Sequence, residues 1–121
     1  MNRKQDRSIL SAEIRVSRKA LLALGDETRQ HIISAMIQEI DNSTGMRVGD
    51  IAALASLSRA SVSQHLKILQ AAGVVSVRRK GKKNYYYFNE DAKMLSDLIR
   101  MLSHAKDLLI RSAEESAKAE H

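Results

Sequence analysis

The chain of 121 residues has no cysteine, no proline and no tryptophan, and it holds only one phenylalanine and three tyrosines. The lack of cysteine excludes disulfides, thiolate metal ligands and thiol redox sensing, and it is compatible with a reducing cytoplasm. Because aromatic residues are few, the core has to be aliphatic, as is common in small helical domains. With 44% hydrophobic residues but no apolar run long enough to cross a bilayer, the chain is expected to fold as one soluble domain.

Acidic residues are missing from residues 51–89, a stretch that contains seven basic residues: Arg59, Lys67, Arg78, Arg79, Lys80, Lys82 and Lys83. The net charge of the chain is +6, so all other residues together carry a single net negative charge. A polyanion bound to this stretch would release condensed counterions, which is the dominant sequence-independent contribution to nucleic-acid binding. DNA is therefore the first expected partner, and a solvated basic face without a partner is the alternative.

Both ends of the chain are polar. Residues 1–8 form a basic stretch without the apolar run of a secretory signal, and residues 113–121 are polar as well. We expect both ends to be flexible and the folded domain to span residues 9–112. Because no export signal is visible, we expect a cytoplasmic protein.

Two helices are predicted in the first third of the chain. Residues 9–24 have a helical apolar period and end at Gly25, and Asp26 is placed to cap a second helix that breaks at 41–45. The apolar residues that recur at three- and four-residue spacing are Leu10, Ile14, Leu21 and Leu24 in the first helix, and Ile33, Met36, Ile37 and Ile40 in the second.

The middle of the chain has the pattern of a helix-turn-helix. A short extended piece, 46–48, leads to a third helix at about residues 49–55, with Ile51, Leu54 and Ala55 expected to face inward. Residues 56–58 form the turn. Ser58 can cap a fourth helix over Arg59–Ala72, and Gly73 suits the left-handed conformation that ends a helix. Two short helices across a tight turn make a helix-turn-helix.

The fourth predicted helix has one apolar face and one polar face. Projection at 100° per residue places Val62, Leu66 and Leu69 on the core side. The opposite side presents Ala60, Ser63, Gln64 and Lys67, flanked by Arg59 and Ser61. Glutamine can pair with adenine, arginine with guanine, and alanine can meet a thymine methyl group, so this face could contact bases and phosphates in the major groove. A merely solvated face is the alternative. For His65, at the edge of the apolar stripe, packing and DNA contact remain equally open.

Residues 74–79 and 84–88 change to a strand pattern and predict a hairpin with a basic tip that turns at Gly81. The candidate phosphate or minor-groove contacts are Arg78, Arg79, Lys80, Lys82 and Lys83. For the tyrosines at 85–87, core packing with one hydroxyl on a phosphate is favoured over stacking on single-stranded bases, because strand side chains alternate between faces.

A last helix is predicted from about Asp91 to Ser112. Its three- and four-residue spacing defines an apolar seam of Leu95, Leu98, Leu102, Ala105 and Leu109. Further apolar residues, namely Met94, Ile99, Met101, Leu108 and Ile110, widen the apolar arc beyond half of the helix circumference. We expect a partner subunit to cover this excess, and a helix buried entirely in its own monomer is the alternative.

Over roughly residues 20–108 the chain resembles the ArsR/SmtB family of bacterial winged-helix repressors. Three motifs in the right order carry the resemblance: 24–29 with the sequence LGDETR, 61–69 with SVSQHLKIL at the recognition helix, and the wing, in which Gly73-Val74-Val75 is followed by 79–82 and the tyrosines. The resemblance implies a mainly α-helical winged helix-turn-helix with a small β-hairpin wing.

The family also implies a homodimer joined through its first and last helices. The residues expected at this interface are Leu10, Ile14, Leu95, Leu98, Leu102, Ala105 and Leu109. The dimer would bind a near-palindromic operator on double-stranded DNA in the bacterial cytoplasm and associate with the nucleoid. Two-fold symmetry would place the recognition helices about one DNA turn, ~34 Å, apart. Repression would last until an effector, such as a small molecule, releases the DNA.

Metal sensors of the family use either thiolates, which this chain lacks, or carboxylates and histidines on the last helix. Alignment through Tyr85 and Tyr86 puts Asp91, His104 and Asp107 at three of the four ligand positions, and Lys93 stands where the family has histidine. A lysine is a poor ligand and its charge repels a metal. We therefore predict no metal and no cofactor. His31 is interpreted as a partly buried packing residue, and His121 as part of the tail.

Together these patterns predict a dimeric, sequence-specific DNA-binding repressor. The alternative function is a winged-helix module that binds an acidic protein partner through its basic stretch. An enzyme is not expected, because the sequence offers no visible nucleophile with its base and no glycine-rich phosphate loop.

Overall fold

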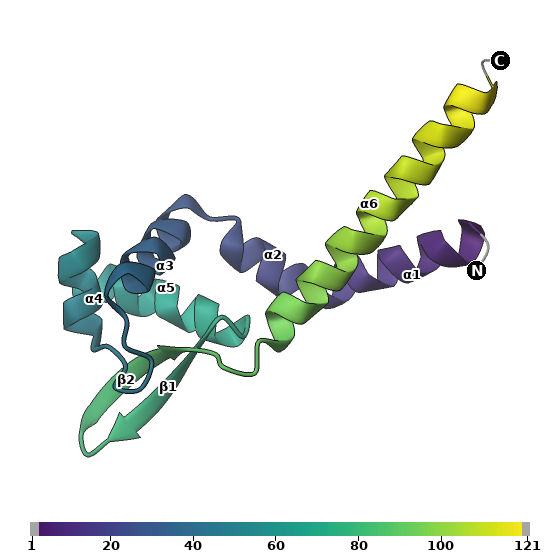
Figure 1. Ribbon diagram of the computed structural model, residues 1–121. Helices are drawn as coiled ribbons and strands as arrows, with labels where there is room; N and C mark the ends of the chain where they lie inside the picture. The colour runs from purple at the N-terminus through teal and green to yellow at the C-terminus, as the bar shows by residue number, and fades with distance from the viewer. Residues whose placement is uncertain (1–2, 120–121) are drawn as a thin grey trace. The chain divides into compact units, whose positions relative to one another are not determined.

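The computed structural model describes residues 3–119, which form two compact units (Figure 1). One unit combines residues up to Arg18 with residues from Lys93 onward, and the other spans Lys19–Ala92. The outermost parts of the two polar ends, residues 1–2 and 120–121, including His121, lie outside the described residues. None of the helices in the described part of the chain is long and apolar enough to span a membrane.

The unit spanning Lys19–Ala92 contains four helices followed by a hairpin: α2 (Arg18–Leu24), α3 (Glu27–Glu39), α4 (Val48–Ala55), α5 (Arg59–Ala71), β1 (Val75–Lys80) and β2 (Lys83–Phe88). The two strands pair in antiparallel register, with Val75 opposite Phe88 and Lys80 opposite Lys83. The hairpin extends away from the helices, as a wing does (Figure 1). This confirms the predicted winged helix-turn-helix, which is mainly α-helical with a small β-hairpin.

The helix ends lie where the capping residues predict them. The Asp26 carboxylate accepts a hydrogen bond from the Arg29 backbone N–H at 2.9 Å, and the Ser58 hydroxyl accepts one from the Ser61 N–H at 3.1 Å. Gly73, just after α5, has the predicted left-handed conformation with φ +81°. These local interactions fix the start of α3 and both ends of α5.

The core of this unit is aliphatic, as expected. Its most deeply buried side chains are Ile32, Met36, Ile51, Val62, Leu66, Leu69, Val75 and Tyr87. The prediction that Leu54 faces inward was wrong, since Leu54 is 43% exposed, and Ile37 of the apolar repeat is 63% exposed. In α3 the core-facing pair is Ile32 and Met36, four residues apart, and Ile37 lies a further 100° around the helix.

The segment before α4 is tied to the hairpin. Met46 and Tyr86 exchange both backbone hydrogen bonds, at 2.9 and 2.7 Å, so the predicted extended piece pairs with β2 as an isolated bridge. The Asn42 side-chain oxygen accepts from the Phe88 N–H at 2.9 Å. The start of the helix-turn-helix and the wing are therefore held in one fixed arrangement.

The other unit pairs α1 (Arg3–Val16) with α6 (Lys93–Ala119), which pack against each other. Two ion pairs join the two helices, Arg3 with Glu115 and Asp6 with Arg111 at 2.9 Å, and a hydrogen bond joins His104 to Glu13 at 2.7 Å. Along α1 the residue numbers of these contacts rise, whereas the numbers of their partners on α6 fall. The two helices therefore run antiparallel.

The bounds of these helices correct the prediction at both ends of the chain. The first helix begins at Arg3 instead of residue 9, and it is interrupted at Ser17 before α2 begins. The last helix begins at Lys93 and continues to Ala119, although residues 113–121 were predicted to be a flexible tail. Arg3 and Asp6 form ion pairs with residues of α6 more than 100 positions away in the sequence. The local sequence pattern, from which the ends were predicted to be flexible, does not contain these interactions.

Candidate nucleic-acid interface

Helix α5 has a buried face and a solvent-facing face. Val62, Leu66 and Leu69 are completely buried, whereas Arg59, Ala60, Gln64 and Lys67 are exposed and Ser61 and Ser63 are half-buried. The three buried side chains anchor the helix in the core, so its polar face is fixed in orientation. The division into faces agrees with the projection made from the sequence.

The side chain of His65 has a hydrogen-bond partner within the protein. Arg29 Nη1 lies 3.3 Å from His65 Nδ1, and because arginine can only donate, Nδ1 is the acceptor. The same guanidinium donates to the backbone carbonyls of Ala23 at 2.8 Å and Leu22 at 3.1 Å. Arg29 thus ties α5 to the end of α2, which favours a packing role for His65. His31 similarly donates from Nε2 to the Ala55 carbonyl at 2.8 Å and ties α3 to α4.

The side chain of Arg59 lies against Gly49 at the start of α4. A Cβ atom built on Gly49 would lie only 2.9 Å from Arg59 Nη2, closer than real Cβ atoms approach. The absence of a side chain at Gly49 therefore leaves the space that the guanidinium occupies. Arg59, the first residue of α5, is held next to the first turn of α4.

The wing carries its charges mainly on one face. The strand register places Arg78 opposite Tyr85 and Lys80 opposite Lys83, so these four side chains share a face. Arg78 Cζ lies 4.4 Å from the centre of the Tyr87 ring, and Lys80 Nζ lies 5.4 Å from that of Tyr85. These distances are within the range of cation–π interactions. The tyrosine rings therefore support the basic side chains of the wing.

The three tyrosines have different environments. Tyr87 is buried, and its hydroxyl donates to the Thr44 carbonyl at 3.2 Å. Tyr86 pairs through its backbone with Met46, and the ring of the half-buried Tyr85 lies near the cations of Arg47 and Lys80. Tyr87 thus packs in the core as predicted, with its hydroxyl bonded inside the protein.

The basic residues of α5 and the wing have no carboxylate partners within residues 3–119. The ion pairs involve Arg29 of α3 and, in the α1–α6 unit, Arg3, Lys93, Arg100 and Arg111. The Arg79 Nε instead donates to the Gly81 carbonyl at the wing turn. Unpaired cations on a rigid surface produce a positive potential that attracts a polyanion.

Sequence reasoning missed Arg47, which directly precedes α4. Its Cζ lies 5.9 Å from the centre of the Tyr85 ring. Arg47 was left out because the acid-free stretch begins only after Asp50, three residues further along the chain. The one available signal was its position next to the helix-turn-helix, since its contact with Tyr85 spans 38 residues of sequence.

The residues predicted at a dimer interface differ in exposure. Leu95 is 50% exposed, Leu102 59% and Leu109 70%, and Ile14 on α1 is also exposed. Leu10 and Ala105 are half-buried. Leu98 is buried within the chain and so adds no exposed surface to the seam.

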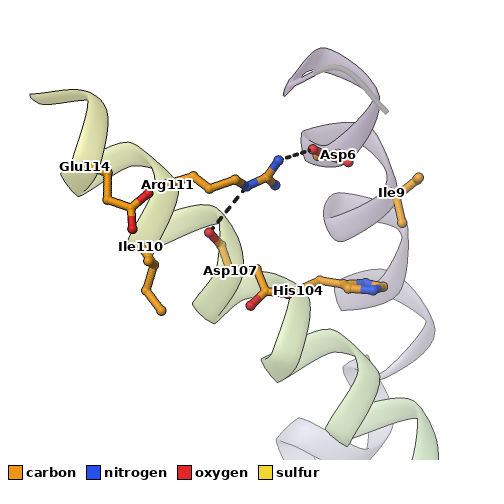
Figure 2. A pocket seen from close by; sticks show the side chains of 7 residues that line it. All are labelled: Asp6, Ile9, His104, Asp107, Ile110, Arg111 and Glu114. Atoms are coloured by element: carbon orange, nitrogen blue, oxygen red, sulfur yellow. Dashed lines mark hydrogen bonds and ion pairs between the residues drawn. The ribbon is translucent and has the colours of Figure 1, made fainter. Parts of the chain in front are cut away.

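The α1–α6 unit also contains the candidate metal residues His104 and Asp107. They line a cavity of about 510 Å³ with Asp6, Ile9, Ile110, Arg111 and Glu114 (Figure 2). His104 donates to Glu13, and the Asp107 backbone carbonyl accepts from Arg111 Nε at 3.5 Å. Asp91 lies in the other unit. Among the described residues, no three histidine or acidic side chains are grouped to hold a metal ion.

A capped helix-turn-helix, whose second helix α5 is anchored by its apolar face, is followed by a basic wing, and this arrangement defines a winged helix-turn-helix transcriptional regulator. Comparison with known proteins identifies the family. Residues 26–77 match the family described as "Bacterial regulatory protein, arsR family". The transcriptional repressor SdpR of Bacillus subtilis is 39% identical over 67 residues, which cover 55% of this chain and 69% of SdpR.

Solved structures agree with this assignment. The crystal structure of NolR from Sinorhizobium fredii is 27% identical, with a TM-score of 0.51 over 84% of this chain and 89% of NolR. A homodimeric winged helix-turn-helix DNA-binding domain from Mycobacterium bovis, 20% identical, shares the fold with a TM-score of 0.51 over 89% of this chain and 90% of that one. The chain belongs to the ArsR family, whose members are transcriptional regulators and not enzymes.

Proposed function

We propose that this ArsR-family regulator represses transcription as a homodimer that binds a near-palindromic operator through α5 and the wing. The observation that carries the proposal is the polar face of α5, fixed by three fully buried side chains and continued by a wing without carboxylate partners in the described chain. A fixed helix face can present a defined set of groups to base edges, and unpaired cations beside it can neutralise phosphates.

The residues of the interface divide into two roles. The first group lies on α5 and would face the major groove, where base edges are read; it consists of Arg59, Ala60, Ser61, Ser63 and Gln64. The second group would contact phosphates or the adjacent minor groove; it consists of Lys67, Arg78, Arg79, Lys80, Lys82 and Lys83. His65 is left outside the reading set in this proposal, because Arg29 already occupies its Nδ1.

Homodimerisation belongs to the same proposal. The M. bovis domain of the same fold is homodimeric, and the exposed leucines of α6 supply an apolar surface for a second copy. An effector that releases the DNA would have to act without thiolate ligands, because the chain has no cysteine.

The test begins with selection of bound fragments from genomic DNA, followed by binding measurements on the selected site. Gln64→Ala should cost about 1–3 kcal/mol on the selected site and relax specificity at one base position. Lys82→Ala should weaken binding to all sequences alike and lower the slope of log K against log salt by about 1.

Two results would reject the proposal. Wild-type affinity for both variants would remove α5 and the wing from the interface. A weak salt slope of the wild-type protein on duplex DNA would instead favour the alternative function, a module that binds an acidic protein.

A further inference from the structure

The ring of Tyr85 is shared by two cations that come from different parts of the fold. Arg47, which directly precedes α4, has its Cζ 5.9 Å from the ring centre, and Lys80 of β1 has its Nζ 5.4 Å from the same point. The bridge between Met46 and Tyr86 fixes the backbone on either side of this contact. One aromatic side chain therefore contacts a cation from the start of the helix-turn-helix and a cation from the wing.

This pair of cations lacks a counter-charge in the described chain. No ion pair joins Arg47 or Lys80 to a carboxylate, and Asp50, three residues after Arg47, forms none either. Each cation is attracted to the ring but repelled by the other, so an anion bound between them would relieve the repulsion. The arrangement is suited to a phosphate group.

The contact also connects cations that follow one another from α5 to the wing. Arg59 at the start of α5 lies against Gly49 in the first turn of α4, Arg47 lies two residues before Gly49, and Tyr85 links Arg47 to Lys80 of the wing. These cations therefore extend from α5 to the wing. A DNA backbone that follows them would meet positive charge along its whole length.

We propose that Arg47 is a DNA-phosphate contact of this regulator and that Tyr85 is the positioning residue that holds Arg47 and Lys80 toward the same stretch of backbone. The inference rests on the proposed DNA-binding function and adds a residue outside the acid-free stretch to the interface. Since phosphates carry no base identity, Arg47 contributes affinity and register but no sequence preference.

The experiment uses the full chain and a mixed-sequence duplex of about 30 base pairs, long enough for two half-sites one turn apart. Arg47→Gln should bind roughly tenfold more weakly, with a salt slope lower by about 1. Lys106→Gln removes the same charge from an exposed position on α6 and is the matched control, expected to stay within about twofold of wild type.

Two variants at Tyr85 separate positioning from charge. Tyr85→Phe keeps the ring and should retain wild-type affinity, whereas Tyr85→Leu removes the ring at unchanged net charge and should weaken binding several-fold, as roughly expected for a lost cation–π support. The double variant of Arg47→Gln and Tyr85→Leu should lose less binding free energy than the two single variants lose in total, because both substitutions disturb one contact. Circular dichroism checks that Tyr85→Leu is folded.

The proposal is overturned if Arg47→Gln binds as well as Lys106→Gln, a result that stands even if Tyr85→Leu does not fold. Equal losses for Tyr85→Phe and Tyr85→Leu would remove the positioning role of the ring. A wild-type protein that binds the duplex without salt dependence would reject the proposed function itself, and this outcome is distinct from both others.

Discussion

Gly45 and the Tyr87 ring show at the scale of single residues how the loop before α4 is built. Gly45 has φ +74°, and a Cβ atom built on it would lie 2.7 Å from Cζ of the Tyr87 ring. The ring is buried and its hydroxyl donates to the carbonyl of Thr44, the preceding residue. Glycine is therefore required twice, once by the backbone conformation and once by the ring beside it.

Gly45→Ala should destabilise the protein by about 2–4 kcal/mol, because it combines left-handed strain with displacement of a buried ring. Gly81→Ala is the matched control. Gly81 has φ +64° at the wing turn with no atom within 4 Å of a built Cβ, so its substitution should cost only the conformational part, about 1 kcal/mol. Urea unfolding measures both, and equal losses would contradict the role given to Tyr87.

At the scale of the element, the start of α3 depends on a charged cap. The backbone N–H of Arg29, together with the positive charge of its side chain, holds the pKa of Asp26 below its ordinary value of 3.8. A carboxyl whose pKa is lower in the folded state stabilises the fold when it is ionised. Its contribution is complete above the unfolded pKa and is lost as the pH falls through the folded value.

Asp26→Asn keeps a side chain that caps helices well but cannot ionise. The free energy of unfolding of the wild type minus that of this variant should be constant above roughly pH 5 and should decrease as the pH falls below about 4. Urea unfolding of both proteins across this pH range provides the measurement. A difference that does not change with pH would show that ionisation of Asp26 contributes nothing to the cap.

At the scale of the whole molecule, the exposed apolar side chains of α6 need an explanation. Leu95, Leu102 and Leu109 are spaced by seven residues and are each at least half exposed. Leucines at this spacing lie along one side of a helix and form the kind of stripe that a second helix covers. A second copy of the chain is the proposed cover.

Leu102→Glu should convert the dimer to a monomer, because it places a charge in the centre of the stripe. Ile37→Glu is the matched control: Ile37 is 63% exposed and Leu102 59%, but Ile37 lies on α3, outside the stripe. Sedimentation equilibrium measures the mass of each protein in solution. A dimer that survives Leu102→Glu, or one that dissociates equally with Ile37→Glu, would rule out this surface as the interface.

The sequence by itself determined the order of the helices and the wing of Lys19–Ala92. Asp26, Ser58 and Gly73 act on backbone groups within a few residues, so their positions in the sequence already predict where α3 begins and where α5 begins and ends. The core face of α5 could be predicted for the same reason, because Val62, Leu66 and Leu69 recur with the helical period. The position of the basic residues of α5 and the wing followed from the acid-free stretch 51–89.

Tertiary structure alone decided the features that depend on contacts between distant residues. Ion pairs with α6 accompany the early start of α1 at Arg3, and Arg29 gives His65 an internal partner 36 residues away. Arg47 joins the basic surface only because Tyr85 of the wing lies beside it. The physical reason is the range of the interactions: caps and periods act over one or two helical turns and can be seen in the sequence, whereas a side chain's neighbours across the fold exist only after the chain has packed.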